Sequence, residues 1–456
     1  MDAAIPLLVT AATWIGLAAP RRAAGRRAPG WPHLDAALAP AVGLGGLSLA
    51  YFAWRFVGLG NTSFALLAWS ALVAVAAWGL PGLVRDRRPG PPALGRPTGR
   101  LLAPALCAGL LAYLALAFFL HARQAPVGQF DAWALWTSRA RLLFGAEDPA
   151  AALALLRRAH PDYPLFLPGA LAAQFALAGA VSVPIPQWTG ALFPAAGAAI
   201  VGAGVRQLGA SAAWSWTAAI LLLGTPLWID WGFAQCADVP LACLVAAAGL
   251  ALALQLRAEE PALSPALAGF LVGLAAWTKN EGMILSLLLF GLFAIWSLAG
   301  RRGWAPVGRV ALGAALPWSA TLAFKLAWKP ASDLRFFLDA PWRTAVEADR
   351  WRFVGASFAE RLDPIGGFPA WGLVWVLAAA GIAITLATPI RRRPEVAFLL
   401  ALVACCWVTW FGIFVATPLD LSWHVRTALD RLMLQLLPVT LLTAFTGAGL
   451  AAQRAP

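Results

Sequence analysis

Apolar segments of about 17 to 25 residues recur along nearly the whole chain and constrain its fold more than any other feature. A helix of about 20 apolar residues is long enough to cross the hydrocarbon core of a bilayer. Hydrophobic residues make up 61% of the 456-residue chain and charged residues 12%. The pattern predicts an all-α polytopic membrane protein with about 13 transmembrane helices. Arginines follow the first apolar segment and do not precede it, so we expect a retained helix there, not a signal peptide.

The positions of the apolar segments give the expected spans. These are residues 3–20, 36–57, 63–84, 101–120, 187–205, 211–229, 238–256, 264–278, 282–299, 306–328, 369–388, 396–416 and 431–450. Residues 165–182 are also apolar enough to span, but counting them would put the Arg391–Arg393 cluster outside. We therefore interpret 165–182 as a helix that lies at, or dips into, the outer interface.

The distribution of arginine predicts the orientation of these spans, because cytoplasmic connections are enriched in Lys and Arg. With the amino terminus outside, 18 basic and five acidic residues fall on the inner side, and 16 of each remain outside. The net charge of +13 is then a topology signal, and no nucleic-acid partner is needed to explain it. Arginine far exceeds lysine, and Ala, Gly and Pro are abundant, which suggests a GC-rich bacterial genome. We expect a multi-pass protein of the bacterial inner (cytoplasmic) membrane.

Common catalytic motifs do not account for this chain. No P-loop, GxSxG or HExxH pattern is present, and no segment has the composition of a soluble domain. The five cysteines have neither metal-ligand nor disulfide spacing. They are Cys107, Cys236, Cys243, Cys405 and Cys406. The clues to function are therefore the charged residues that interrupt or border apolar segments.

The stretch GLAAWTKNEG, residues 273–282, interrupts an apolar run that begins at Pro265. The 13 residues from Pro265 to Trp277 form about 20 Å of helix, which is shorter than the ~30 Å hydrocarbon core. If this helix starts at the inner surface, its end is the tip of a hairpin below the outer surface. We expect Lys279 and Glu281 to line a wet, protein-walled cavity there. The alternative is a snorkelling lysine that pairs with Glu281 at an ordinary interface.

Two segments after the fourth span add polar groups on the expected outer side. In FDAW, residues 130–133, Asp131 lies among aromatic residues, and Arg139 follows about two helical turns later. The alternative interpretation is an amphipathic interfacial helix with Asp131 as its N-cap. The segment HPDYPLFLP, residues 160–168, is extended by its prolines and carries His160 and Asp162. Its alternative role is a rigid entry to the interfacial helix.

Two later segments also place charge at the same side. The segment ADVPLA, residues 237–242, contains Asp238, for which the alternative is an ordinary N-cap of the following span. The segment WHVRTALDRLMLQLLP, residues 423–438, places His424 and Arg431 on one helix face. Its alternative interpretation is a weak surface pair between Asp430 and Arg431.

Together these residues would surround an anionic, lipid-linked substrate that reacts with a hydroxyl or an amine. A carboxylate can accept the proton of the acceptor. Cations can stabilise a departing phosphate, with or without Mg²⁺ or Mn²⁺ held by oxygen ligands. The candidate carboxylates are Asp131, Asp162, Asp238 and Glu281, and the candidate cations are Lys279, Arg139 and Arg431.

In their order along the chain, the segments resemble the GT-C superfamily of integral-membrane glycosyltransferases. That superfamily includes the dolichyl-phosphate-mannose protein mannosyltransferases and the lipid A aminoarabinose transferases. FDAW resembles the first outer-loop acid of the family, HPDYPLFLP its Pro-Tyr-rich segment, ADVPLA its second-loop acid and GLAAWTKNEG its short hairpin. WHVRTALDRLMLQLLP is similar to a late element of some bacterial branches.

The resemblance implies three regions. Residues 1–100 would be an N-terminal extension of three transmembrane helices. Residues 101–300 would be a GT-C-like catalytic core with outer loops 121–186 and 230–237 and with juxtamembrane helices on the outer face. Residues 301–456 would be a C-terminal transmembrane region with an outer loop at 329–368.

The resemblance also implies transfer of a sugar from a polyprenyl-monophosphate donor to a glycan, lipid or protein acceptor at the extracytoplasmic face, usually with inversion. Asp131 would be the general base, and Lys279, with Arg431 and Arg139, would bind the donor phosphate. Contacts to acceptor, sugar or metal would come from Asp162, Asp238, His160, Glu281 and His424. Many relatives carry two adjacent acids at the position of Asp131, and some carry a lysine at that of His160, which leaves metal dependence open.

Two other classes of function remain open from the residues alone. A transporter or flippase of lipid-linked sugars would be expected to place its polar groups near the bilayer midplane and to contain internal repeats. A glycan polymerase or ligase that uses a polyprenyl-diphosphate donor would share an outward-facing polar site. Competition between monophosphate and diphosphate donors would separate this last class from the first.

Overall fold

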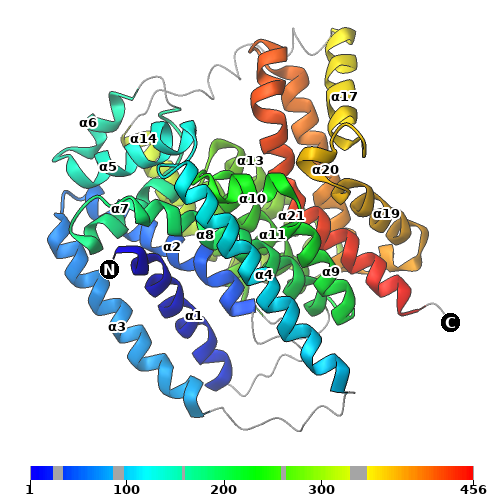
Figure 1. Cartoon of the computed structure of the whole chain (residues 1–456), viewed down its shortest axis with the longest axis horizontal. Coiled ribbons are helices and arrows are strands. Elements are labelled where there is room, and N and C mark those ends of the chain that lie inside the picture. The colour runs from blue at the N-terminus through cyan, green and yellow to red at the C-terminus, as the bar shows by residue number, and fades with distance from the viewer. Residues whose placement is uncertain are drawn as a thin grey trace.

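The computed structural model describes residues 2–23, 34–85, 97–156, 160–257, 263–328 and 347–454, and every regular element in these ranges is a helix. Figure 1 shows long helices packed side by side with shorter helices at one end of the bundle. Residues 329–346 lie outside the described ranges, so 18 of the 40 residues of the loop expected at 329–368 are not described.

Nine helices in the described ranges are long and apolar enough to cross a membrane, which confirms the polytopic all-α class. The predicted count of 13 spans is not confirmed. The nine are α2 (Leu34–Phe56), α3 (Asn61–Arg85), α4 (Pro97–Gln124), α8 (Pro184–Gln207), α11 (Asp238–Gln255), α13 (Asn280–Ala299), α14 (Trp304–Ala327), α20 (Pro394–Ala416) and α21 (Leu421–Ala452).

The other predicted spans are short or broken. Their apolar helices are α1 (Ile5–Ala23, preceded by the short η1, Asp2–Ala4), α12 (Pro265–Ala276) and α19 (Val374–Ala387, preceded by α18, Phe368–Trp371). The span predicted at 211–229 consists of α9 (Ala212–Leu223) and α10 (Pro226–Phe233), bent by 63°. Pro226 explains the break, because proline disfavours helical conformation in the residue before it and lacks a backbone N–H.

Helices too short to span connect α4 to α8. They are the π-helical turn η2 (Ala132–Thr137), α5 (Ser138–Gly145), α6 (Pro149–Ala154) and α7 (Phe166–Ala178). Every residue of α7 from Phe166 to Leu177 is buried within the protein, and the interpretation that 165–182 lies at, or dips into, the outer interface stays a prediction. The helix is apolar on all sides, as expected of a buried helix rather than an amphipathic one. The amphipathic α17 (Ala348–Leu362) and the short η3 (Pro389–Arg392) complete the described elements.

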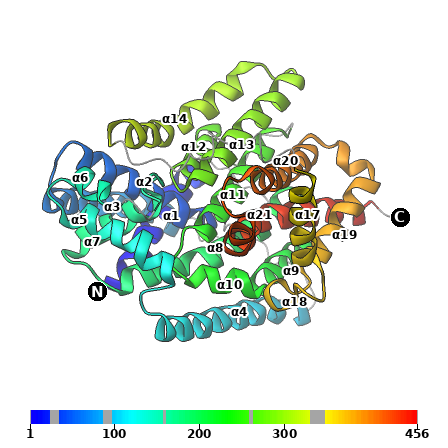
Figure 2. The ribbon, with the colours of Figure 1, turned by 90° about the horizontal axis from the view of Figure 1, so that it is seen from above.

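Helices α11 and α21 lie at the centre of the bundle, with α4 along one edge (Figure 2). The apolar stretches of α11 and α21 are almost wholly buried, and the two helices pack against each other. Asp238 begins α11, and Arg431 and Gln435 lie within α21. The fold therefore carries these polar residues into the protein interior, where they need polar partners.

Helix α12 packs against α14 at a distance that only glycine allows. A Cβ atom on Gly269 would lie 1.9 Å from the backbone oxygen of Val310, and one on Gly313 would lie 2.0 Å from that of Ala266. Small residues often permit such close approach between membrane helices. The contact supports α12, which leads directly into the turn that carries Lys279.

Replacing Gly269 with leucine is expected to cost more than the ~1–3 kcal/mol typical of overpacking, because the obstacle is backbone and not a movable side chain. Thermal unfolding of the detergent-purified protein would measure the loss. The control is Gly308→Leu on α14, the helix that α12 contacts, since a Cβ on Gly308 meets nothing within 4 Å. Equal melting of the two variants would contradict the close contact between α12 and α14.

Candidate functional site

The turn between α12 and α13 presents Lys279. Helix α12 ends at Ala276 after 12 residues, about 18 Å, which confirms the predicted short helix. Lys279 has an extended backbone and precedes the first residue of α13. Contacts to α2 and α7 fix the turn: the indole of Trp277 donates to Ser48 at 3.0 Å, and its carbonyl accepts from the backbone N–H of Phe166 at 2.8 Å.

The Lys279 amine is enclosed by acids. Its Nζ lies 2.9 Å from Oδ1 of Asp238 and 3.0 Å from Oε1 of Glu281, and it is 5.5 Å from the centre of the Tyr163 ring. Lys279 is only 1% exposed, so it does not line a wet cavity as expected. The snorkelling alternative is also wrong, since the pair with Glu281 exists but the amine does not reach water. Two carboxylates compensate the buried charge instead.

Asp238 is the centre of this arrangement and is fully buried. Its Oδ1 accepts hydrogen bonds from Lys279 Nζ and Gln435 Nε2, each at 2.9 Å. Its Oδ2 accepts from Nη2 and Nε of Arg431 at 3.0 and 3.3 Å. The N-cap of α11 is Ala237 and Asp238 is the first residue of the helix, so the N-cap interpretation of Asp238 is wrong.

Arg431 joins Asp238 to Asp131. Its Nη1 lies 2.7 Å from Oδ2 of Asp131, and its guanidinium is 4.8 Å from the centre of the Trp231 ring on α10. Asp131 makes no capping bond to η2, which rules against the N-cap interpretation there as well. The predicted pair of Asp430 with Arg431 is wrong, because Asp430 lies 3.5 Å from Arg361 on α17.

We call this set the charged cluster: Asp131, Asp238, Lys279, Glu281, Arg431 and Gln435. Its charged members are three acids and two cations. The side chains of Lys279 and Asp238 are buried, whereas those of Arg431, Glu281 and Asp131 are 19%, 20% and 25% exposed. The side chains of Arg431, Glu281 and Asp131 therefore form the accessible part of the charged cluster.

A second polar group holds residues 160–164 beside the charged cluster. Oδ2 of Asp162 accepts from Nδ2 of Asn280 at 3.0 Å and lies 3.2 Å from Nζ of Lys325, which also donates to Oδ1 of Asn280 at 2.7 Å. The ring of His160 stacks on that of Tyr163, with centres 4.7 Å apart. Burial raises the pKa of Tyr163 well above its ordinary value, so its hydroxyl stays neutral.

Arg139 supports this segment from within the protein. Its Nη2 donates to the backbone oxygens of Pro161 and Tyr163 at 3.2 and 2.6 Å. Burial lowers the pKa of Arg139 to about 10, against the opposing effect of Asp162. Because Arg139 is buried, its expected role in binding a donor phosphate is corrected to one of holding 160–164 in place.

Compared with protein-family profiles, curated proteins and solved structures, the chain matches none. The likeness to the GT-C superfamily therefore remains a prediction from short motifs. What the structure adds is that four of the motifs supply side chains to one cluster: FDAW, ADVPLA, GLAAWTKNEG and the segment at 423–438.

Two expected contact residues lie at the margin of this arrangement. His160 is exposed, and its φ of +45° is unusual for a residue other than glycine. The ring of His424 packs against that of Phe414 on α20, with centres 4.8 Å apart. Neither is among the residues that form the charged cluster.

Sequence reasoning missed Gln435 and Lys325. Gln435 lies one helical turn after Arg431 and is a lone amide in an apolar stretch of α21, so helix periodicity was the signal that pointed to it. Lys325 is one of only three lysines in the chain, and this rarity was its only signal. Its partners Asp162 and Asn280 come from other parts of the chain.

Metal dependence was left open by the sequence, and the residues present do not fit the Mg²⁺ or Mn²⁺ ion that Asp238 and Asp162 would hold if a metal were bound. Both oxygens of Asp238 already face cationic or amide donors, and the Lys325 amine lies beside Asp162. Within the described ranges, no three His, Cys, Asp or Glu residues are grouped as metal ligands. A cation would have to displace Lys279, Arg431 or Lys325, so we derive no step through a metal.

Proposed function

We propose that this protein is an integral-membrane glycosyltransferase of the bacterial inner membrane. It transfers a sugar from a polyprenyl-monophosphate donor to an acceptor at the extracytoplasmic face, with inversion. The observation that carries the proposal is the partly exposed guanidinium of Arg431, held between Asp238 and Asp131. The site thus offers an anion-binding cation and a carboxylate to the same reacting centre.

The donor phosphate competes with Asp131 for the guanidinium of Arg431. Arginine binds phosphate and carboxylate through the same array of N–H donors, so such an exchange keeps its hydrogen bonds satisfied. Asp131 is then released toward the acceptor. Asp238 keeps its hold on Arg431 through Nη2 and Nε, so the cation stays in position during the exchange.

In the chemical step the acceptor oxygen or nitrogen forms a bond to the anomeric carbon as the bond to the phosphate oxygen breaks. Asp131 takes the proton of the acceptor, and the leaving group is the polyprenyl phosphate. Arg431 stabilises the negative charge that develops on this phosphate, and the transition state has the oxocarbenium character of glycosyl transfer. Lys279 is buried behind the reacting groups and balances the charge of Asp238.

Replacing Arg431 with glutamine is expected to weaken donor binding about 10- to 100-fold, since a hydrogen bond to a charged group contributes about 1.5–3 kcal/mol. Binding of a synthetic polyprenyl-monophosphate sugar to the purified protein would measure the change. Arg426→Gln is the matched control, because Arg426 lies on the same helix and is exposed. If Arg431→Gln and Arg426→Gln bind the donor with equal affinity, Arg431 is not the phosphate ligand.

The function itself is tested by extracting the lipids that co-purify with the protein, identifying them by mass spectrometry and assaying sugar transfer from the corresponding donor. Recovery of a polyprenyl-monophosphate sugar and its turnover would support the proposal. Turnover of a diphosphate donor alone would indicate a polymerase or ligase. Movement of the lipid across vesicles without sugar transfer would indicate a flippase.

A further inference from the structure

Three polar side chains from separate parts of the chain form a closed triangle of contacts beside the charged cluster. Oδ2 of Asp162 accepts from Nδ2 of Asn280 at 3.0 Å and from Nζ of Lys325 at 3.2 Å. The third side is the bond from Lys325 Nζ to Oδ1 of Asn280, at 2.7 Å. Asp162 belongs to the segment 160–164, Asn280 begins α13, and Lys325 lies in the last turn of α14. The triangle therefore joins three elements at one point.

Compensation of the Asp162 charge does not by itself explain Lys325. Asp162 is fully buried and needs a cation nearby. Arg139 is also buried and lies close enough to Asp162 for the two charges to interact. The Lys325 amine makes its shorter bond to the Asn280 oxygen, while the Asn280 nitrogen donates to the carboxylate. Both ends of the amide are thus held, so the triangle fixes Asn280 as well as compensating Asp162.

Asn280 stands between Lys279 and Glu281, the two residues that the turn between α12 and α13 supplies to the charged cluster. Because the three residues are consecutive, a displacement of Asn280 would move both of its neighbours. Lys279 in turn pairs with Asp238, and Asp238 holds Arg431. The place of Asn280 therefore bears on the cation that is proposed to meet the donor phosphate.

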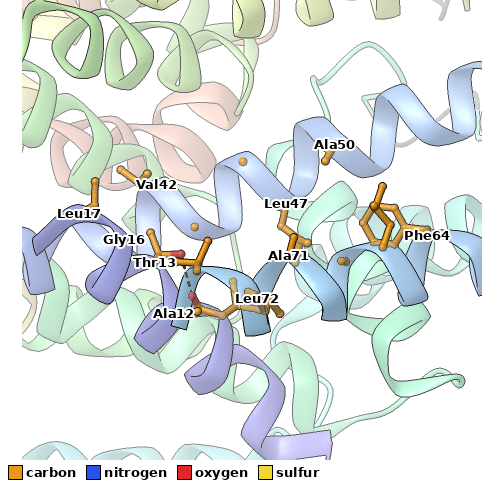
Figure 3. A pocket seen from close by; sticks show the side chains of 16 residues that line it. Ala12, Thr13, Gly16, Leu17, Val42, Leu47, Ala50, Phe64, Ala71 and Leu72 are labelled. Atoms are coloured by element: carbon orange, nitrogen blue, oxygen red, sulfur yellow. Dashed lines mark hydrogen bonds between the residues drawn. The ribbon is translucent and has the colours of Figure 1, made fainter. Parts of the chain in front are cut away.

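The turn is also attached at Trp277, whose indole donates to Ser48 of α2. Elsewhere along its length, α2 lines an apolar pocket of about 450 Å³ together with α1 and α3 (Figure 3), and a helix beside a pocket lacks packing contacts there. Helix α14, in contrast, packs on α12 so closely that only glycine fits at position 269. The attachment through Lys325 therefore rests on the more closely packed of the two helices.

We propose that Lys325 is a positioning residue for sugar transfer: acting through Asn280, it holds in place the turn that supplies Lys279 and Glu281 to the charged cluster. This role rests on the proposed function, whereas the hold on the turn can be measured without a sugar. Lys325 donates to Asp162 and Asn280, so it acts on the reaction through these residues.

The hold on the turn is tested by acetylating the full-length protein in detergent with acetic anhydride and following Lys279 by peptide mass spectrometry. Lys279 is 1% exposed, so it should react slowly in the wild type. In Lys325→Met its acetylation should be about 10- to 100-fold faster, the change in a local equilibrium that loss of a hydrogen bond to a charged group produces. Lys325→Arg keeps the charge and the N–H donors and should restore most of the protection. Arg309→Met is the matched control, because Arg309 is an exposed cation on the same helix.

The same variants are assayed for single-turnover transfer from a synthetic polyprenyl-monophosphate sugar. In Lys325→Met the rate should fall by up to about 100-fold, as expected when reacting groups are misplaced. Donor affinity should stay within about threefold of wild type, because Asp238 keeps its bonds to Arg431. Asn280→Ala should slow transfer to a similar extent. The double variant should be no slower than either single variant, since both changes remove the same interaction.

Unchanged protection of Lys279 in Lys325→Met would overturn the proposal. So would additive losses of rate in the double variant, which would mean that Lys325 and Asn280 act independently. A lower melting temperature with the wild-type rate per folded molecule would indicate a purely structural role and also overturn it. If Lys325→Met does not fold, the comparison is made in an Asp162→Asn background, which removes the buried charge that Lys325 compensates. If the wild type transfers no sugar from this donor, the proposed function fails, and the acetylation of Lys279 alone decides whether Lys325 holds the turn.

Discussion

Asp238→Asn is expected to lower the free energy of unfolding by about 3–5 kcal/mol, the cost of leaving a buried charge without its partner. The asparagine would retain hydrogen-bonding capacity but no charge, while Lys279 and Arg431 remain in the interior. Thermal unfolding in detergent, followed by tryptophan fluorescence, would show the loss as a lower melting temperature.

Two comparisons isolate the electrostatic cause. Asp349→Asn removes a carboxylate that is 94% exposed and paired with Arg352 on the surface. Its free energy of unfolding should therefore lie within about 0.5 kcal/mol of the wild-type value. The double variant Asp238→Asn/Lys279→Met also removes a buried cation and should recover part of the stability. If Asp238→Asn has the melting temperature of the wild type, the ion pairs of Asp238 with Lys279 and Arg431 do not stabilise the folded protein.

Asp131→Asn is expected to reduce the rate of sugar transfer by about 10²- to 10⁴-fold, the usual contribution of a general base. The amide has the shape of the carboxylate but cannot take the proton of the acceptor. Folding should be almost unaffected, because Asp131 is 25% exposed and Arg431 keeps its pair with Asp238. The rate is measured with a polyprenyl-monophosphate sugar under single-turnover conditions, with donor affinity and melting temperature determined in parallel.

Asp230→Asn is the matched control, since Asp230 is an exposed aspartate on the nearby α10 and pairs with His121 at 3.2 Å. It should transfer sugar at the wild-type rate. If Asp131→Asn stays within about threefold of wild type, Asp131 is not the base, because such a change is far smaller than the loss of a proton acceptor produces.

The positions of helices could be predicted where the length of an apolar segment determines them. Burial and bends, which depend on how the helices pack, could not. Helices such as α13 and α20 begin and end within two residues of their predicted spans. The burial of α7 on all sides was not predicted, because lipid and protein interior are both apolar and composition cannot distinguish a helix facing one from a helix buried in the other. The bend between α9 and α10 was missed as well, although Pro226 marks it in the sequence.

The candidate site follows the same division. Asp131, Asp238, Lys279 and Arg431 stood out in the sequence because charged residues are rare in apolar segments. Each also had an ordinary local alternative; those of Asp131, Asp238 and Arg431 were an N-cap, an N-cap and a pair with the neighbouring Asp430. The structure replaces each of these local roles with a contact to a residue distant in sequence.

By itself, the sequence determined that the chain folds into apolar helices and that a few charges among them require compensation, because both follow from the cost of exposing polar groups to hydrocarbon. Only the tertiary structure decided which groups meet. Lys279 and Arg431 both reach Asp238, from 41 and 193 residues away, so the pairing depends on how α11, α13 and α21 pack. The same packing buries Lys279 and leaves Asp131 accessible, since exposure is a property of the assembled bundle and not of any segment in it.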